Sequence, residues 1–288
     1  MTSKISVSIV LYKTDHHDIL KCLESLYHYS PDIKIFVIDN SPSDCLKSLF
    51  NTPNIEYIHL PSNPGFGSAH NIALRASNRD GFRYHLVLNS DVYFDNDILS
   101  PMLTYIDAHP EVGQMMPLVL NPDGSIQRLC KLVPTPGDLF FRRFLPARLK
   151  AANNRRFELH ESGYDRVMFV PYLSGCFMLL RNSAIAEIGG FDERFFLYGE
   201  DIDLSRRMAA RFDAIFFPEA SITHGHAAAS YKSLKMLAVH IVNVSRYFNK
   251  WGWLRDPERD RLNARTLAQL QPVPPDRPSV IQRSQDGS

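Results

Sequence analysis

Short apolar runs rich in β-branched residues alternate with segments of helical periodicity through the first hundred residues. The expected strands span residues 5–12, 33–38, 55–60 and 84–88. Between them, apolar positions three and four residues apart predict helices over residues 16–29 and 68–77. This alternation predicts an α/β fold with a mostly parallel central sheet flanked by helices.

The second half of the chain is less regular. Residues 113–120 and 168–180 read as further strands, and a strand-like segment covers residues 214–217. A helix is expected over residues 231–251, and its apolar stripe comprises Leu234, Leu237, Ile241, Val244, Phe248 and Trp251. From Gln271 onward the sequence is rich in proline and poor in large apolar residues, which predicts a disordered tail.

Polar clusters follow three of the expected strands, at residues 12–14, 39–41 and 89–91. In a parallel sheet the ligand binds at the carboxyl ends of the strands. Asp39 and Asp91 could therefore hold a divalent ion or bind a ribose and base. A turn or a helix cap is the alternative explanation for either carboxylate alone.

Three other segments could carry chemistry. The loop at residues 63–67 contains two glycines and opens a helix, an arrangement that favours an anion such as a diphosphate, although most such loops are only turns. Residues 191–204 contain several carboxylates beside aromatic residues. A helix beginning near Gly199 would present Glu200 and Asp201 in its first turn. The alternative is that these two carboxylates only complement the helix dipole. In the segment His224-Gly225-His226, either histidine could be a metal ligand or a hydrogen-bonded loop residue.

Composition limits the function classes. The 288 residues are 44% apolar and 22% charged, as in a folded globular protein, and the net charge of +1 gives no electrostatic case for a nucleic-acid partner. No apolar run approaches the roughly 20 residues that a membrane-spanning helix needs, and no signal-peptide core is present. The four cysteines form no CxxC pair, so reduced, packed thiols and a cytoplasmic location are expected.

The segments together resemble the family 2 glycosyltransferases, which are inverting enzymes with the GT-A nucleotide-sugar fold, and within them the bacterial rhamnosyltransferase-like branch of surface-polysaccharide biosynthesis. The resemblance covers roughly residues 5–255. Its motifs are SIVLY at 8–12, VIDNS at 37–41, NPGFG at 63–67 with Asn71, LNSD at 88–91, GCFMLLR at 175–181, GFDE at 190–193, GEDIDL at 199–204, His224 and YFNKWGW at 247–253.

The resemblance implies a role for each matched position. Asp201 is the expected general base, with Glu200 close to the acceptor. Asp91 and His224 are the expected ligands of Mg²⁺ or Mn²⁺, with His226 as the alternative histidine. Residues implied to form the nucleotide-sugar pocket are Tyr12, Asp39, Asn40, Asn63, Gly67, Asn71, Asn89 and Ser90.

Asn89 departs from the family pattern, because the metal-binding DxD motif often has an aspartate at that position. An amide can coordinate through its oxygen but brings no charge, which puts tight metal binding without the donor in doubt. The QxxRW signature of processive synthases does not occur in the chain, which favours addition of one sugar per encounter.

The implied partners are a nucleotide-diphosphate sugar donor and a glycan or lipid-linked glycan acceptor. Among donors dTDP-rhamnose is favoured, with a UDP-hexose or UDP-N-acetylhexosamine as the alternative. A sugar nucleotidyltransferase and an inactive nucleotide-sugar-binding module are the rival functions.

Domain boundaries and a membrane contact follow from the same resemblance. The expected transferase domain covers residues 1–255, divided into a nucleotide-sugar half at 1–100, an acceptor-side half at 101–230 and the helix at 231–255, with an extension at 256–288. A peripheral contact with the cytoplasmic face of the inner membrane is an open alternative to a fully cytoplasmic location. It would use the basic segment 142–156 or the basic residues near Trp251 and Trp253, namely Lys232, Lys235, Arg246 and Lys250.

Overall fold

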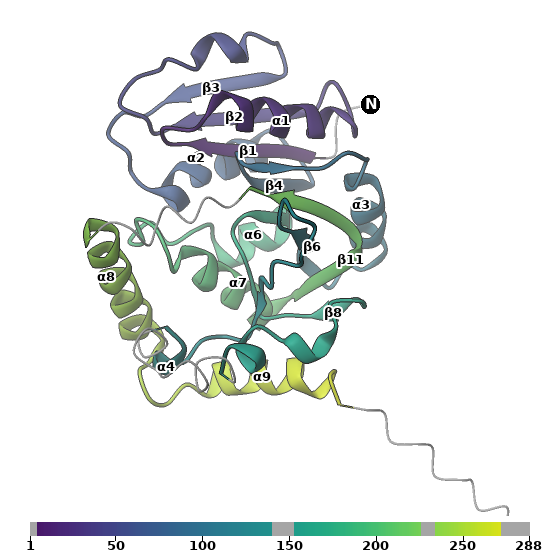
Figure 1. Ribbon diagram of the computed structural model, residues 1–288, viewed down its shortest axis with the longest axis vertical. Coiled ribbons are helices and arrows are strands. Elements are labelled where there is room, and N and C mark those ends of the chain that lie inside the picture. Colours follow the sequence, from purple (N-terminus) through teal and green to yellow (C-terminus); the bar gives the residue numbers. More distant parts are fainter. Residues whose placement is uncertain (1–4, 140–152, 226–233, 272–288) are drawn as a thin grey trace, which may run out of the picture.

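A computed structural model describes residues 5–139, 153–225 and 234–271. Within these residues, nine strands form a central sheet with the order β3-β2-β1-β4-β10-β6-β11-β5, and β8 pairs with β11 (Figure 1). The strands are β1 (Ile5–Leu11), β2 (Lys34–Asp39), β3 (Ile55–His59), β4 (Tyr84–Asn89), β5 (Val92–Tyr93), β6 (Val112–Leu120), β8 (Met168–Phe169), β10 (Phe177–Arg181) and β11 (Asp213–His224).

Most neighbouring strands of this sheet are parallel, as the sequence predicts. β1 pairs in parallel with β2 and β4, and β2 pairs in parallel with β3. β10 runs antiparallel between β4 and β6, and β6 is again parallel to β11. The α/β class with a mostly parallel sheet is therefore confirmed.

Helices cover both faces of the sheet. α1 (His16–Tyr27) and α3 (Leu99–Ala108) bury their apolar side chains in the larger core on one face. α2 (Phe66–Arg79), α6 (Asn182–Ile188) and α7 (Glu200–Arg211) enclose the smaller clusters on the other face. Alternate residues of β1 and β4 face the larger core, while the opposite face of these strands carries the buried polar residues Ser6, Ser8 and His85.

The strand expected over residues 168–180 is wrong in extent. The chain there forms three short strands, because each stretch has a different partner: β8 pairs with β11, β10 pairs with β4 and β6, and β9 (Tyr172–Leu173) forms a separate two-stranded sheet with β7 (Cys130–Lys131). Pro171, which has no N–H to donate, lies between β8 and β9.

Two helices complete the described structure at the C-terminal side, α8 (Leu234–Trp251) and α9 (Pro257–Ala268), and a short helix, α4 (Pro136–Leu139), lies near them (Figure 1). The expected apolar stripe of α8 is correct at Val244 and Phe248 but wrong at Ile241, which is 45% exposed. Buried Tyr247 takes part in the packing instead. None of the described helices is both long and apolar enough to cross a membrane.

Some expectations fall on residues that the structure does not describe. His226, Lys232, the tail from residue 272 and most of the basic segment 142–156 lie outside the described ranges. The domain boundaries stay predictions. Three of the four cysteines are buried thiols and Cys45 is exposed.

Candidate active site

The polar clusters expected at the strand ends meet at one edge of the sheet. β2, β1 and β4 are adjacent and parallel, so Asp39, Tyr12 and Asn89 all lie at the carboxyl ends of neighbouring strands. Figure 1 shows these three strands side by side in the upper part of the molecule.

Asp39 is buried and firmly held. The Tyr57 hydroxyl donates to its Oδ2 across 2.7 Å, and the Ser41 amide donates to its Oδ1 across 2.8 Å. Burial, followed by this bond to Asp39, raises the pKa of Tyr57, so the phenol keeps its proton. Asp39 is therefore a buried carboxylate with a fixed orientation, and its contact with a nucleotide stays a prediction.

Asn40 and Tyr12 complete this end of the sheet. The buried Asn40 donates through Nδ2 to the Gly65 carbonyl oxygen at 3.4 Å, and its Oδ1 accepts no hydrogen bond from the described residues. The Tyr12 side chain is 52% exposed. A buried amide oxygen without a protein donor is an acceptor that a polar ligand can satisfy.

Asp91, Asn89 and His224 converge at the next strand end. His224 pairs with Val92 in the β5–β11 ladder, which brings its Nε2 to 3.4 Å from Asp91 Oδ1 and 3.4 Å from Asn89 Nδ2. Gln127 Oε1 lies 3.0 Å from His224 Nδ1, and Gln127 Nε2 donates to the His224 carbonyl oxygen at 2.8 Å.

These contacts fix the orientation of the imidazole. Because Gln127 Oε1 can only accept, Nδ1 donates to it, and Nε2 is the ring nitrogen that faces Asp91. One carboxylate, one imidazole nitrogen and an amide that can present its oxygen by rotation make a donor set that suits Mn²⁺ or Mg²⁺. The residues therefore fit the expected metal ion.

The glycine loop brings α2 against a distant segment. Gly65 has φ +102°, and a Cβ there would lie 2.4 Å from the Phe196 carbonyl oxygen, so only glycine fits. Gly67 is similarly close to the Phe191 side chain. Asn63, which is half-buried, also has a positive φ of 47°. The loop thus joins the nucleotide side of the sheet to residues 191–196.

Asn71 reinforces this junction. Its Oδ1 accepts from the Phe191 amide at 2.8 Å, and its Nδ2 donates to the Phe191 carbonyl oxygen and to Glu193 Oε1, both at 2.9 Å. These bonds occupy both ends of the buried amide. They give Asn71 a positioning role, and its direct contact with a donor stays a prediction.

Asp201 lies in the first turn of α7, as the sequence predicts. Its Oδ2 accepts from the Tyr172 hydroxyl at 3.3 Å and from the Gly175 amide at 3.2 Å, while Oδ1 accepts from the Ile202 amide at 2.8 Å. Burial raises the pKa of Asp201, and these bonds together with Lys131 oppose that rise. The carboxylate is thus more basic than an exposed aspartate.

Glu200 precedes it in the same turn. Its side chain is buried, and its Oε2 has no hydrogen-bond partner among the described residues. Burial, and then the charge of Asp201, raises the pKa of Glu200 to about 8. At neutral pH Glu200 is therefore mostly a neutral acid that can donate a hydrogen bond.

Two further carboxylates of the same segment have a structural role. Lys250 on α8 donates to Asp192 at 2.8 Å and forms an ion pair of 2.6 Å with the fully buried Asp203, which also accepts from Trp251 at 2.8 Å. The acidic residues at 191–204 thus have two roles: Glu200 and Asp201 are catalytic candidates, and Asp192 and Asp203 bind side chains of α8.

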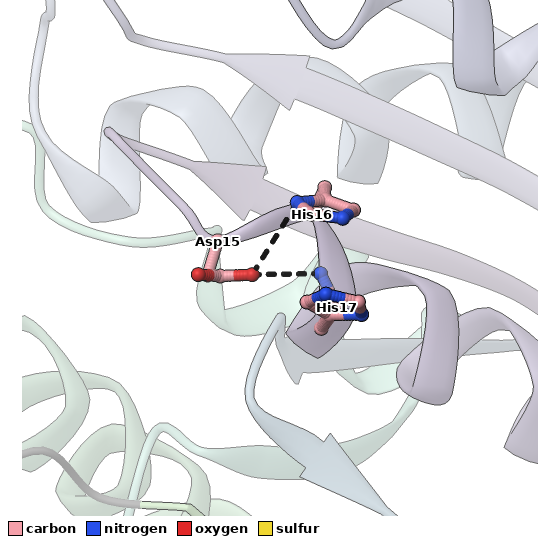
Figure 2. Close-up of side chains that lie close together, drawn as sticks. All are labelled: Asp15, His16 and His17. Atoms are coloured by element: carbon pink, nitrogen blue, oxygen red, sulfur yellow. Dashed lines mark hydrogen bonds and ion pairs between the residues drawn. The ribbon is translucent and has the colours of Figure 1, made fainter.

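A second group of possible metal ligands lies at Asp15, His16 and His17 (Figure 2). Asp15 caps α1, accepting from the His17 amide at 2.8 Å, and His16 Nδ1 lies 3.6 Å away. All three side chains are exposed. Helix capping accounts for this arrangement.

The sequence model of the family described as Glycosyl transferase family 2 matches residues 6–189, which is more than half of the chain. The chain belongs to this family. The enzyme is a family 2 glycosyltransferase with the GT-A fold.

Named relatives and solved structures are consistent with this assignment. The transferase is 27% identical to the N-acetylglucosaminyl-diphospho-decaprenol L-rhamnosyltransferase of Mycobacterium tuberculosis, over 90% of this chain and 89% of that protein. It is 26% identical to the rhamnosyltransferase WbbL of Escherichia coli K12, over 90% and 98% of the two chains.

Similar solved structures share the fold. TarS 1–349 of S. aureus with UDP-GlcNAc has a TM-score of 0.57 at 17% identity, over 92% of this chain and 72% of that one. The mannosyltransferase PcManGT of Pyrobaculum calidifontis, solved with GDP-Man and Mn²⁺, has a TM-score of 0.52 at 17% identity, over 92% and 74%.

Several residues of the transferase site carry no sequence signal. Gln127 and Tyr172 touch His224 and Asp201 from segments far away in the chain. Tyr57 could be noticed only because its strand neighbours the strand that ends at Asp39. Gly175 belongs to the motif GCFMLLR, but the sequence does not predict that its amide donates a hydrogen bond to Asp201.

Proposed function

We propose that this transferase moves one sugar, with inversion, from a nucleotide-diphosphate sugar to a lipid-linked or oligosaccharide acceptor in surface-polysaccharide synthesis, and that dTDP-rhamnose is the donor. The rhamnosyltransferase names of two relatives that match along nearly all of this chain support this choice of donor. The diphospho-decaprenol in the name of one of them supports the lipid-linked acceptor.

One observation carries the proposal: the expected metal site and the expected base contact the same turn. The Cys176 carbonyl oxygen accepts from the Asn89 amide at 2.9 Å, while the Gly175 amide donates to Asp201 at 3.2 Å. Burial raises the pKa of the Cys176 thiol to about 12, and the charges of Asp91 and Asp201 both contribute to that rise. A donor diphosphate near Asp91 and an acceptor hydroxyl near Asp201 would therefore be neighbours.

The donor end of the site would bind the nucleotide through Asp39, Asn40 and Tyr12, with Asn63, Gly67 and Ser90 bordering the sugar diphosphate. Asp91 and His224, together with the Asn89 amide, would hold Mg²⁺ or Mn²⁺. When bound, such an ion neutralises charge on the departing diphosphate.

At the acceptor end, Asp201 takes the proton of the attacking hydroxyl. The hydroxyl oxygen bonds to the anomeric carbon from the face opposite the diphosphate, and the bond from that carbon to the diphosphate oxygen breaks. A single displacement inverts the anomeric configuration. Neutral Glu200 donates a hydrogen bond to a hydroxyl or carbonyl group of the acceptor and adds no second negative charge beside the base.

A transfer assay tests this function. The enzyme is given Mn²⁺ and a synthetic lipid-diphosphate N-acetylglucosamine acceptor with dTDP-rhamnose, UDP-glucose or UDP-N-acetylglucosamine in parallel. We expect a disaccharide product with dTDP-rhamnose. Product from a UDP-sugar alone would replace the donor assignment, and nucleotide binding without any product would favour an inactive binding module.

We also propose that the transferase contacts the cytoplasmic face of the inner membrane. Trp253 and Leu254 lie just beyond the C-terminal end of α8 and are 41% and 89% exposed, and Ile241 and Val242 are exposed on α8 itself. Apolar and basic side chains on one surface suit an anionic lipid interface. Flotation with anionic liposomes tests this contact, and an absence of binding at low salt would contradict it.

A further inference from the structure

A basic groove lies beside α8, apart from the residues assigned to the donor. Its cavity is about 370 Å³, and it is lined by Arg194, Phe195, Arg246, Asn249 and Lys250. Three of these five residues are cationic, one is an amide and none is acidic. A wall of this composition fits an anion.

Internal ion pairs leave positive charge in the groove. Arg194 and Lys250 share Asp192, and Lys250 shares Asp203 with Arg207, so three cationic side chains face two carboxylates. Arg246 donates through Nη1 to two neutral acceptors, the Arg194 carbonyl oxygen at 2.7 Å and Asn243 Oδ1 at 3.1 Å. These bonds orient its guanidinium without cancelling its charge.

The groove adjoins the acceptor end of the site. The buried Phe195 lines the groove, and its ring lies close to Gly199, whose Cβ position would be 3.4 Å from Phe195 Cδ1. Gly199 immediately precedes Glu200 and Asp201. Asn243 on α8 also donates to the Leu197 carbonyl oxygen at 2.7 Å, which fixes the intervening loop. The groove is thus connected to the candidate base through Phe195 and the loop that leads to α7.

We propose that this groove binds the diphosphate of a lipid-linked acceptor, through the side chains of Arg194, Arg246 and Lys250. The proposal rests on the proposed function and names the part of the acceptor that the enzyme would recognise. Arginine side chains bind phosphoryl oxygens through paired N–H groups, and a diphosphate carries enough negative charge to match the groove. Exposed Trp253 lies against Phe248 at the end of α8, where it can meet the adjoining lipid chain.

Binding of farnesyl diphosphate in EDTA tests the groove without sugar transfer. The chain has two tryptophans, and both contact residues that line the groove. The centre of the Trp251 ring lies 5.2 Å from the Lys250 ammonium, and Trp253 donates to Asn249 at 2.8 Å, so intrinsic fluorescence reports the titration. We expect Arg246→Gln and Arg194→Gln each to weaken the affinity about tenfold, as for one lost charge-assisted hydrogen bond. Arg79→Gln, which removes an exposed arginine at the end of α2, is the matched control and should leave the affinity unchanged.

Other outcomes would overturn the proposal. They are no binding of farnesyl diphosphate, equal weakening by Arg79→Gln, or equal binding of farnesol, which lacks the diphosphate. If Arg246→Gln weakens binding to phosphatidylglycerol vesicles and leaves the affinity for farnesyl diphosphate unchanged, the groove is a membrane headgroup site instead.

Nucleotide binding in Mn²⁺, measured on the same variants, separates the two proposals. Wild-type affinity for dTDP with a loss of farnesyl diphosphate binding supports the groove. Failure of sugar transfer with intact farnesyl diphosphate binding would count against the proposed function and leave the groove as a diphosphate site.

Discussion

The phenol of Tyr172 donates a hydrogen bond to Oδ2 of Asp201 across 3.3 Å, from a two-stranded sheet outside the central one. In that sheet Lys131 pairs with Tyr172, and its ammonium lies 5.4 Å from the centre of the phenol ring. Both groups favour the charged form of the carboxylate that we propose as the base.

Tyr172→Phe should therefore raise the pKa of Asp201 and move the acid limb of the kcat/KM profile to higher pH. A base acts only above its pKa, so activity falls at acidic pH and recovers on the alkaline side. We expect roughly a tenfold loss on the acid limb, because a hydrogen bond to a charged group contributes about 1.5 kcal/mol. Tyr105→Phe, which removes a hydroxyl on α3, is the control. A uniform loss at every pH would indicate a structural role for Tyr172 instead.

Asp201→Asn keeps the size of the side chain and removes the base. We expect transfer to fall about 10²–10⁴-fold, the usual contribution of general-base catalysis. The affinity for the nucleotide donor, measured by calorimetry, should change little because Asp201 lies at the acceptor end. A parallel fall in donor affinity would show that Asp201 holds the donor rather than the acceptor proton.

Glu200 should set the alkaline limb of the profile. Its pKa of about 8 means that it loses its proton as the pH rises through that value, and the new charge beside Asp201 would weaken acceptor binding. Glu200→Gln keeps a neutral donor at every pH, so we expect the decline above pH 8 to disappear while activity near pH 7 is retained. If the variant shows the same alkaline decline, another group causes it.

Metal binding can be measured without turnover by electron paramagnetic resonance of Mn²⁺ in the presence of dTDP. We expect Asp91→Asn to abolish most binding. Gln127→Leu should weaken it about 10–100-fold, because the second hydrogen bond of a metal-binding histidine fixes its tautomer. Asp95→Asn, at an exposed carboxylate just beyond β5, serves as the control. An unchanged titration in Asp91→Asn would place the metal elsewhere.

A buried polar chain beneath β1 predicts acid sensitivity. His85 bonds to Ser6 and Ser8 at 2.8 Å each, and Ser8 bonds to His70 at 2.7 Å. Burial lowers the pKa of His85 to about 3 and also lowers that of His70. Unfolding lets both histidines take up protons when the pH is below their ordinary pKa of about 6.5. The free energy of unfolding should therefore decrease as the pH is lowered below that value.

Each histidine should contribute a slope of about 1.4 kcal/mol per pH unit below that point. Urea unfolding at pH 7.5, 6 and 5 measures it. His85→Gln can still bond to both serines, and its free energy of unfolding should depend less steeply on pH than that of the wild type. The control is His16→Gln, at the exposed start of α1, which should show the same slope as the wild type. Equal slopes in wild type and His85→Gln would mean that His85 titrates normally in the folded state.

The N-terminal half of the site follows from the sequence because its signals are local. Apolar β-branched runs predict β1, β2 and β4, and parallel pairing then brings Asp39, Asn89 and Asp91 to one edge of the sheet. Gly199 likewise predicts the start of α7 and the position of Asp201 in its first turn. Periodicity and turn chemistry depend on residues close in the chain, so they can be read without the fold.

Only the tertiary structure distinguishes carboxylates that look alike in the sequence. Asp201 faces the turn at Gly175, whereas Asp203, two residues later, is buried under Lys250 and Trp251. Gln127 and Tyr172 reach the site from distant segments, and Ile241 stays exposed despite its helical spacing. Such roles depend on partners far away in the chain, and these partners become neighbours only when the sheet order and the positions of α7 and α8 are fixed. The sequence by itself therefore determined the family and the main strands and helices of the N-terminal half, while long-range packing decided what each side chain faces.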